Sequence, residues 1–207
     1  MADAYEKLID LDPDCARHMR ALGFHLLPRF YGTYDQLELE ARRTAARTSD
    51  AWGAGGYAWV YFDALATDDA ALAQLDTDFF IEGLRDILLV TRDQHVTNLL
   101  AAFCAITMAA DRDRPAPLPD DSEAARARLH DCLEWILTQH LQELHPLVWS
   151  QTLMAPGLTP SLPSRRALVS KGRQAALRAI ALRFAEEIAD GTTIAFSSSG
   201  MYRLRAP

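Results

Sequence analysis

The sequence predicts an all-α protein built from stacked antiparallel helix pairs, with a short β-hairpin at its C-terminal end. Alanine and leucine are abundant and β-branched residues are sparse, which favours helix over strand. Apolar residues recur at helical spacing along most of the 207 residues. The exception is segment 192–204, where two short runs flank Ser199-Gly200, a pattern typical of a hairpin. Because a lone ribbon is marginally stable, we expect it to pack on the helices.

Proline and glycine divide the first fifty residues into three predicted helices. The first ends before Pro13, because the residue before a proline avoids the α region. Asp14 is expected to cap the second helix, and Pro28 ends or kinks it. Gly32 supplies a turn, and the third helix starts at Tyr34.

Several positions in this segment share the spacing of a known motif: Tyr5, Leu8, Pro13, Leu22, Gly23, Gly32, Tyr34, Leu37 and Ala41. Together they resemble a tetratricopeptide repeat over about the first 50 residues. The segment departs from the repeat because Gly32 comes about two residues late and no proline closes the unit. The resemblance implies a scaffold of stacked helix pairs that binds other proteins and carries no chemistry. In such a scaffold, Gly23 lets two helices approach closely.

Residues 51–110 predict further helices. The small residues Gly53 to Gly56 precede an aromatic-rich helix and indicate either close helix packing or a loop before that helix. Asp76 is expected to cap the next helix. Asp93 is expected to cap a nearly all-apolar helix over 95–110, which we place at the centre of the core.

The segment 111–121, DRDRPAPLPDD, predicts a proline-rich connector. We interpret it as a loop inside a single helical domain, 1–207. It would join an N-terminal half, 1–110, to a C-terminal half, 122–207, because the same helical pattern resumes after it.

Start and stop signals divide the C-terminal half. Ser122 is expected to open a helix that Pro146 kinks or ends. A second loop is predicted over 155–163, which contains three prolines. Ser164 then caps a long helix, and Gly191 fits the position just after its C-terminus.

Composition excludes several classes of protein. The formal net charge of -7 argues against non-specific nucleic-acid binding, which needs a basic surface. The first residues carry acids and no apolar stretch, so we expect no signal peptide, and no apolar run is long enough to span a bilayer. Cys15, Cys104 and Cys132 form no CxxC motif, which is typical of reduced thiols in the cytoplasm. Abundant alanine and arginine in place of lysine indicate a bacterial source with a GC-rich genome.

Common catalytic and metal-binding signatures are absent from the sequence. It contains no GxGxxG, HExxH or GxSxG motif and no P-loop. His140 and Glu143 have the reverse order of the Glu-x-x-His pair of di-iron bundles, without a second copy. Cys104 lies in an apolar run that does not suit a reactive thiol. We therefore expect no catalytic residue, no cofactor and no metal.

Charge is distributed unevenly. Acids dominate residues 63–86, whereas bases dominate residues 164–183. One interpretation is that the acids cap helices and the bases cover a solvated helix face. The other is that a charged surface meets a partner of opposite charge. The aromatic residues of 52–62 are either covered by a second layer of helices or exposed as a binding hot spot. The partner-binding residues expected on this second interpretation are Trp52, Trp59, Asp63, Asp68, Asp69, Asp76, Asp78 and Glu82.

The leading functional hypothesis is a non-catalytic protein-binding module. Its most concrete form is a cytoplasmic bacterial immunity or adaptor protein that holds a toxin or a secretion-system component with a basic surface. The alternative is an enzyme with a cleft between helices, and its candidate groups are His95, His140, Glu143 and Asp63. A helical ligand-binding regulator ranks third. The sequence does not identify the partner or the oligomeric state.

Overall fold

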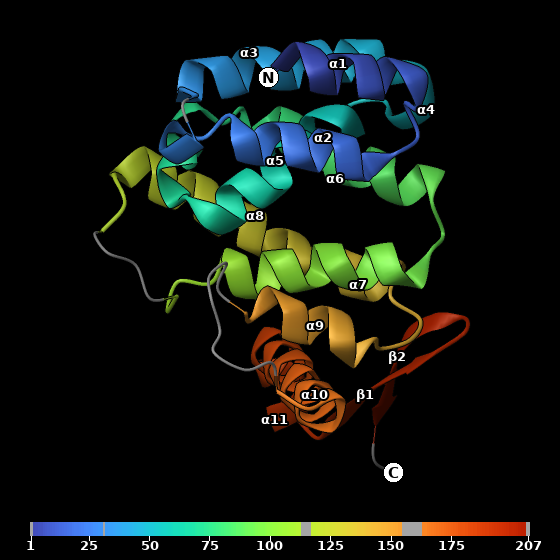
Figure 1. Cartoon of the computed structure of the whole chain (residues 1–207). Helices are drawn as coiled ribbons and strands as arrows, with labels where there is room; N and C mark the ends of the chain where they lie inside the picture. Colours follow the sequence, from blue (N-terminus) through green and yellow to red (C-terminus); the bar gives the residue numbers. More distant parts are fainter. Residues whose placement is uncertain (1, 31, 113–116, 155–162, 206–207) are drawn as a thin grey trace. The chain divides into compact units, whose positions relative to one another are not determined.

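The computed structural model of the chain is a helical protein with one two-stranded antiparallel sheet near its C-terminal end (Figure 1). It describes residues 2–30, 32–112, 117–154 and 163–205. The predicted fold class, mostly α with a hairpin, is confirmed. Over these ranges no helix combines the length and the apolar character needed to cross a membrane.

The chain forms two compact units that alternate along the sequence. The first comprises Met1–Thr91 and Asp113–Leu129, and the second comprises Arg92–Arg112 and His130–Pro207. Helix α8 (Asp120–Gln139) therefore supplies residues to both units. The division into halves at 111–121 stays a prediction, and residues 113–116 lie outside the described residues.

The first unit is built around helix α5. Its elements are α1 (Ala2–Leu11), α2 (Ala16–His25), the 3-10 turn η1 (Pro28–Phe30), α3 (Tyr34–Arg47), α4 (Ser49–Trp52), α5 (Gly55–Thr67), the 3-10 turn η2 (Asp69–Gln74) and α6 (Thr77–Val90). Every residue of α5 from Gly55 to Phe62 is buried. Helices α2, α3 and α6 all pack against α5 (Figure 1), which explains why its sequence is apolar or small on every side.

Glycines set the spacing of these helices. A Cβ built on Gly23 would lie 1.7 Å from the carbonyl oxygen of Val60, so α2 can contact α5 only without a side chain there. The close approach expected at Gly23 is thus confirmed, with α5 as the partner helix. Of the small residues expected to form a loop or a packing surface, Gly53 has a φ of +56° and ends α4, while Gly56 contacts α3 and Thr48.

Capping residues define most of the predicted helix starts. The side chain of Asp76 accepts a hydrogen bond from the backbone N–H of Phe79 at 3.1 Å, and Asp93 accepts from His95 at 2.8 Å, as predicted. The prediction for Asp14 was wrong, because Cys15 is the residue that precedes α2 and its side chain makes no capping hydrogen bond.

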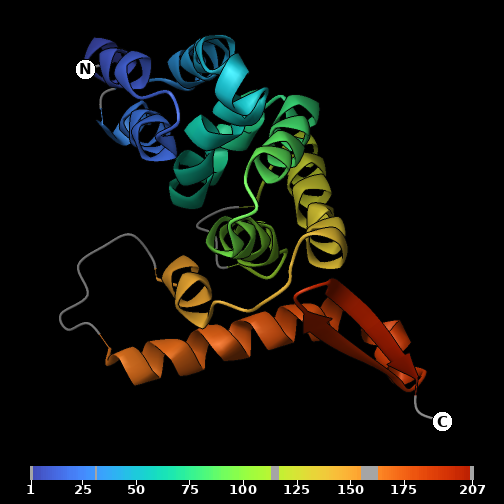
Figure 2. The same cartoon turned by 90° about the vertical axis from the view of Figure 1, so that its right-hand side faces the viewer.

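The second unit packs α9 between α7 and α10. Its elements are α7 (Gln94–Ala102), the π-turn η3 (Phe103–Thr107), the C-terminal part of α8, α9 (Pro146–Thr152), α10 (Arg165–Arg183), α11 (Ala185–Ala189), β1 (Thr192–Ser197) and β2 (Gly200–Arg205). A Cβ on Gly172 would lie 1.8 Å from the carbonyl oxygen of Pro146, so α9 and α10 also touch through backbone. Figure 2 shows the hairpin beside the C-terminal part of α10, and β1 packs on α11.

Several predicted boundaries in this part of the chain need correction. The helix expected over 95–110 is α-helical only as far as Ala102. It continues as the short π-helix η3, which ends at Thr107. Helix α8 starts at Asp120 rather than at Ser122. It ends well before Pro146, which instead starts α9, where its missing N–H costs nothing.

The predicted boundaries after residue 163 agree better with the structure. Ser164 caps α10 as expected, but the helix breaks at Phe184 before α11. Gly191 follows α11 with a φ of +82°, and the hairpin pairs Thr192 with Arg205. Of the predicted loop, residues 155–162 lie outside the described residues.

We predict that Gly23→Ala destabilises the protein by about 3 kcal/mol, because overpacking against the Val60 carbonyl outweighs the gain of about 1 kcal/mol in helix propensity. Urea unfolding followed by circular dichroism measures the difference. Ala46→Gly, at an exposed position of α3, is the control and should cost about 1 kcal/mol from propensity alone. A stabilised Gly23→Ala variant would contradict the packing described.

Candidate functional site

Most of the predicted acidic surface is engaged within the first unit. Arg20 donates two hydrogen bonds to Asp63, at 2.7 and 3.1 Å. Asp68 accepts a hydrogen bond from the hydroxyl of Tyr34 at 2.8 Å, and burial together with this contact raises the pKa of Tyr34 to about 12. Asp69 is half-buried in the turn η2. Asp63 and Asp68 therefore join elements of the first unit to one another.

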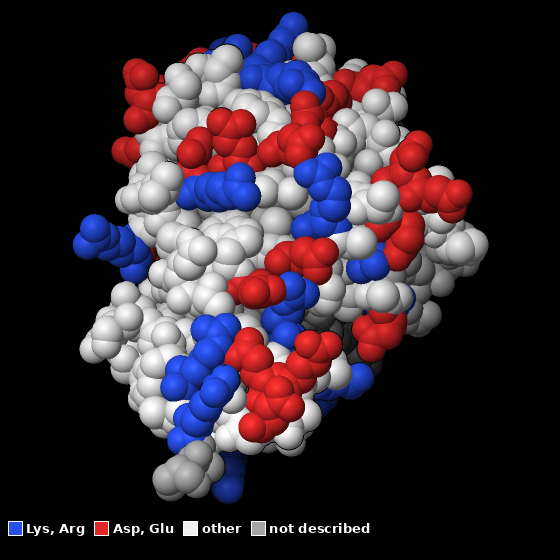
Figure 3. All heavy atoms as spheres, turned by 180° about the vertical axis from the view of Figure 1, so that it is seen from behind, with Lys and Arg blue, Asp and Glu red and all other residues white. Residues whose placement is uncertain are grey.

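The other acids divide between structural contacts and solvent. Asp76 caps α6 and pairs with Arg42, which lowers the pKa of its carboxyl. Asp78 pairs with Arg128, whereas Glu82 is exposed on α6. On the face shown in Figure 3, acidic and basic side chains lie beside one another over most of the surface. This arrangement favours the interpretation in which the acids cap helices and form ion pairs.

The structure corrects the assignment of Trp52 and Trp59 to a partner-binding surface. Their exposed fractions are 8% and 1%. Trp59 lies on the fully surrounded helix α5, and the indole N–H of Trp52 donates to the carbonyl oxygen of Pro13 at 2.9 Å. The two rings meet edge to face at 5.9 Å. They belong to the core of the first unit rather than to a binding surface.

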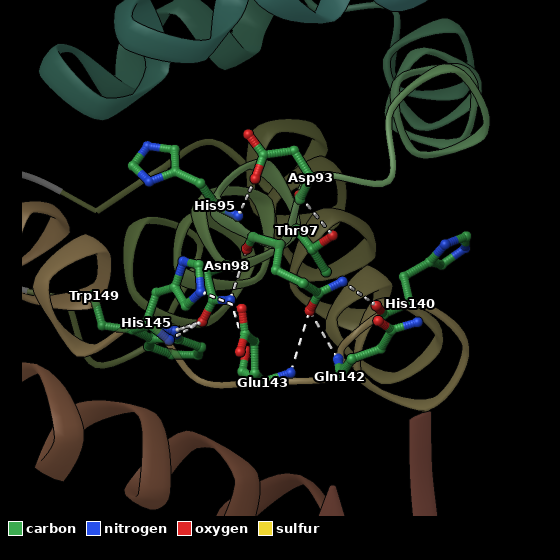
Figure 4. Close-up of polar contacts among 10 residues, drawn as sticks. Asp93, His95, Thr97, Asn98, His140, Gln142, Glu143, His145 and Trp149 are labelled. Atoms are coloured by element: carbon green, nitrogen blue, oxygen red, sulfur yellow. Dashed lines mark hydrogen bonds and ion pairs between the residues drawn. The ribbon is translucent and has the colours of Figure 1, made fainter. Parts of the chain in front are cut away.

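Polar side chains of α7 hold the segment 140–145 in the second unit (Figure 4). The side-chain oxygen of Gln94 accepts from the backbone N–H groups of Gln142 and Glu143, at 2.8 and 3.3 Å. Its amide N–H donates to the carbonyl of His140 at 3.0 Å. A single glutamine thereby replaces the backbone partners that an irregular segment lacks.

Asn98 of α7 also holds the segment 140–145 in place by hydrogen bonds. Its side chain is fully buried, and its Oδ1 accepts from the backbone N–H of His145 and from the indole N–H of Trp149, both at 2.9 Å. Its Nδ2 donates to the carbonyl oxygens of Gln94 and Glu143, at 2.7 and 2.9 Å. All the hydrogen-bonding capacity of this amide is used, so its role is structural.

Of the groups expected for an enzyme, His95, His140 and Glu143 belong to the second unit and Asp63 belongs to the first. His95 is exposed, and Glu143 pairs with His145 at the surface, at 2.9 Å. Burial lowers the pKa of His140, whose backbone carbonyl takes part in the support described above. Asp63 belongs to the first unit, where Arg20 binds it.

A pocket of about 290 Å³ lies in the first unit, lined by residues of α1, α2, η1 and α3. Leu22 and Leu26 are buried in its wall. Tyr5, His25 and Phe30 are half-buried and contribute aromatic rings. Its volume is at the lower end of the range for ligand sites, large enough for a single side chain or a small molecule.

The aromatic residues of the pocket form a stack. The rings of Tyr5 and His25 lie 5.5 Å apart at 29°, and Phe30 lies 6.0 Å from His25. His25 Nδ1 is 2.8 Å from the carbonyl oxygen of Ala21 and 3.2 Å from the hydroxyl of Tyr5. The shorter contact, to an oxygen that can only accept, assigns the hydrogen to Nδ1. The ring is thereby fixed against Tyr5.

Glu40 is the charged residue that lines the pocket, and it is 7% exposed. Its Oε1 accepts from Arg43 at 2.8 Å, whereas its Oε2 is buried without a hydrogen-bond partner. Burial, and then the neighbouring carboxyl of Glu6, raises the pKa of Glu40. The pKa of Glu6 is lowered instead, because Arg47 binds it. The ionised form of Glu40 thus lacks one stabilising donor.

Glu38, on the same helix, differs from Glu40 because both of its carboxylate oxygens accept hydrogen bonds. Its Oε2 accepts from the hydroxyls of Tyr57 and Tyr61, at 2.7 and 2.8 Å, and its other oxygen binds Arg42. Glu40 therefore has fewer hydrogen-bond donors than Glu38, and the second neighbour of its carboxyl group is the carboxyl group of Glu6.

Sequence reasoning missed this pocket, although one signal was present. Glu40 falls on the apolar stripe of α3 formed by Leu37, Ala41 and Thr44. A carboxylate on the buried side of a helix is a marker of function because its desolvation is costly.

Models of protein families, curated proteins and solved structures were all compared with the chain, and none matches it.

A second group that sequence reasoning missed can hold a metal. The ligand atoms of Asp12, Cys15 and His18 all lie within 4.8 Å of one another. The expectation of no metal rested on the histidines of the second unit and on the missing CxxC motif. The spacing Asp-x-x-Cys-x-x-His was the available signal.

We predict that Asn98→Ala costs about 3 kcal/mol of stability, because several buried partners lose their hydrogen bonds at once. His95→Ala, one turn away and exposed, should change stability by less than about 0.5 kcal/mol. Thermal unfolding of both variants provides the comparison. Equal stabilities would show that the amide does not support the segment.

We predict that Glu40→Gln stabilises the free protein by about 1 kcal/mol at neutral pH, because the amide removes a buried charge and can donate to Glu6. The raised pKa means that folded Glu40 binds more protons than unfolded Glu40. Wild-type stability should therefore fall as pH rises from about 4.5 through the folded pKa. The variant should lack this decrease.

Urea unfolding at a series of pH values measures both curves. Asp50→Asn removes an exposed carboxylate of α4 and serves as the control, with the pH profile of the wild type. A Glu40→Gln variant that is less stable than wild type at neutral pH would mean that the ionised carboxylate is already satisfied.

Proposed function

We propose that the chain is a non-catalytic protein-binding module and that its pocket receives an arginine or lysine side chain of a protein partner. The single observation that carries this proposal is the buried oxygen of Glu40 that has no donor. A cationic group supplies both the missing hydrogen bond and the compensating charge. The net charge of -7 favours the approach of a basic partner.

The walls of the pocket suit such a side chain. Leu22 and Leu26 offer apolar surface to an alkyl stem, and the rings of Tyr5 and Phe30 offer faces to its cationic end. Arg29 already places its guanidinium 4.9 Å from the centroid of Phe30, so this ring accepts a cation. Burial of one long side chain in a pocket is typical of an interface hot spot.

The lining residues favour binding over catalysis. Among the described residues that line the pocket, none is a serine, threonine, cysteine or lysine, four of the side chains that serve as nucleophiles in enzymes. The polar side chains among these lining residues are Glu40, Gln36, His25 and Tyr5. In its most concrete form, the proposed module is a cytoplasmic bacterial immunity or adaptor protein that covers a basic surface of a toxin or secretion-system component.

The chemistry of the pocket is tested with Nα-acetyl-arginine amide and its uncharged analogue, Nα-acetyl-citrulline amide, by NMR titration. We predict that the arginine compound shifts resonances of Tyr5 and His25 and that the citrulline compound does not. Glu40→Gln should weaken binding at least about tenfold, because a charge-assisted contact is lost. Asp50→Asn should bind as the wild type does.

Wild-type affinity should also fall as pH drops through the raised pKa of Glu40, since a proton then competes with the cation.

The protein partner is tested by capture from lysate with the same three proteins. The proposal expects at least one protein that the wild type and Asp50→Asn retain and Glu40→Gln loses. Binding of the arginine compound without any Glu40-dependent protein would contradict a protein-binding function and leave a small-ligand pocket. Capture that is equal for all three proteins would place the interface elsewhere.

A further inference from the structure

Three side chains with different metal-ligating atoms converge where α1 passes into α2. Asp12, Cys15 and His18 are spaced three residues apart. One carboxylate oxygen, the thiol sulfur and one imidazole nitrogen lie within 4.8 Å of one another. The three residues belong to the first unit, and none of them lines the pocket.

The local backbone explains the convergence. Pro13 follows the end of α1, and the chain turns tightly, with the N–H of Cys15 donating to the carbonyl of Asp12 at 3.2 Å. The N–H of His18 donates in turn to the carbonyl of Cys15 at 3.0 Å, which places both side chains on one side of the first turn of α2. The indole of Trp52 binds the carbonyl of Pro13 and fixes this turn on the core.

We propose that Asp12, Cys15 and His18 form a zinc-binding site. Thiolate, imidazole and carboxylate are the three side-chain ligands that Zn²⁺ takes in proteins. Calcium and magnesium prefer all-oxygen sites, so the sulfur and nitrogen ligands exclude them. Three protein ligands leave a fourth tetrahedral position for water or for a ligand atom from outside the chain.

The geometry is close to the one a metal needs. Zinc–ligand distances of about 2.0–2.3 Å at tetrahedral angles require ligand atoms about 3.3–3.8 Å apart. Asp12 is exposed, and Cys15 and His18 are half-buried, so a metal ion can reach all three side chains from solvent. Cys15 makes no capping hydrogen bond with its side chain, and its sulfur is not committed to the helix start.

Zinc at this position would tie the end of α1 to the start of α2. Because the folded turn brings together ligands that the unfolded chain separates, binding stabilises the folded state. The inference rests on the ligand geometry and is independent of the function proposed for the pocket, so either can fail without the other.

The test is a Co²⁺ titration of the untagged full-length protein, followed by its absorbance, and then displacement by Zn²⁺ in a calorimeter. We predict one equivalent of metal, tetrahedral cobalt bands and a thiolate-to-cobalt charge-transfer band. Cys15→Ser should abolish the charge-transfer band. Asp12→Asn and His18→Gln should weaken zinc binding about tenfold or more, since each removes a ligand.

The control is His95→Gln, which removes an exposed histidine from the second unit and should leave affinity unchanged. Far-UV circular dichroism checks that each variant is folded. Three results would each overturn the proposal: no binding at micromolar metal, undiminished binding in the Cys15, Asp12 and His18 variants, or a loss of binding in the control.

Discussion

The packing of the first unit depends on which side of helix α3 faces helix α5. Two buried tyrosine hydroxyls on α5 donate hydrogen bonds to Glu38, which places this residue on the side of α3 that faces α5. Because residues two apart on a helix point roughly 200° from each other, the same packing turns Glu40 away from α5 and into the pocket beside α1. The same constraint that secures the core therefore buries a second carboxylate, which the chain does not fully satisfy.

This arrangement fits the binding site that we propose. A buried carboxylate with a free oxygen lowers the stability of the chain, and an isosteric amide would remove that cost. Natural proteins keep such costs mainly where a ligand recovers them. The remaining acids are used differently, since Asp63, Asp68 and Asp76 serve as ion-pair partners and caps. Of these four acids, Glu40 alone has a buried oxygen without a hydrogen-bond partner.

The sequence predicted the helical class and many of the helix limits, because caps and prolines act locally. Asp76, Asp93 and Ser164 start their helices as expected. It did not predict which carboxylate would lie in a pocket, since this depends on α1, α2 and α3 meeting in space. Trp52 and Trp59 were assigned to a partner-binding surface for the same reason: their burial depends on how the neighbouring helices pack around α4 and α5, which the sequence does not reveal.

The most direct test of this account is the pKa of Glu40, measured from the pH dependence of its side-chain carboxyl carbon resonance with and without a bound arginine compound. The account predicts a pKa above the ordinary value of 4.5 in the free protein, and a fall of that pKa when the cation binds. A pKa at or below 4.5 in the free protein would show that the ionised carboxylate is already stabilised within the chain. A pKa that the cation does not change would show that the cation does not bind this carboxylate.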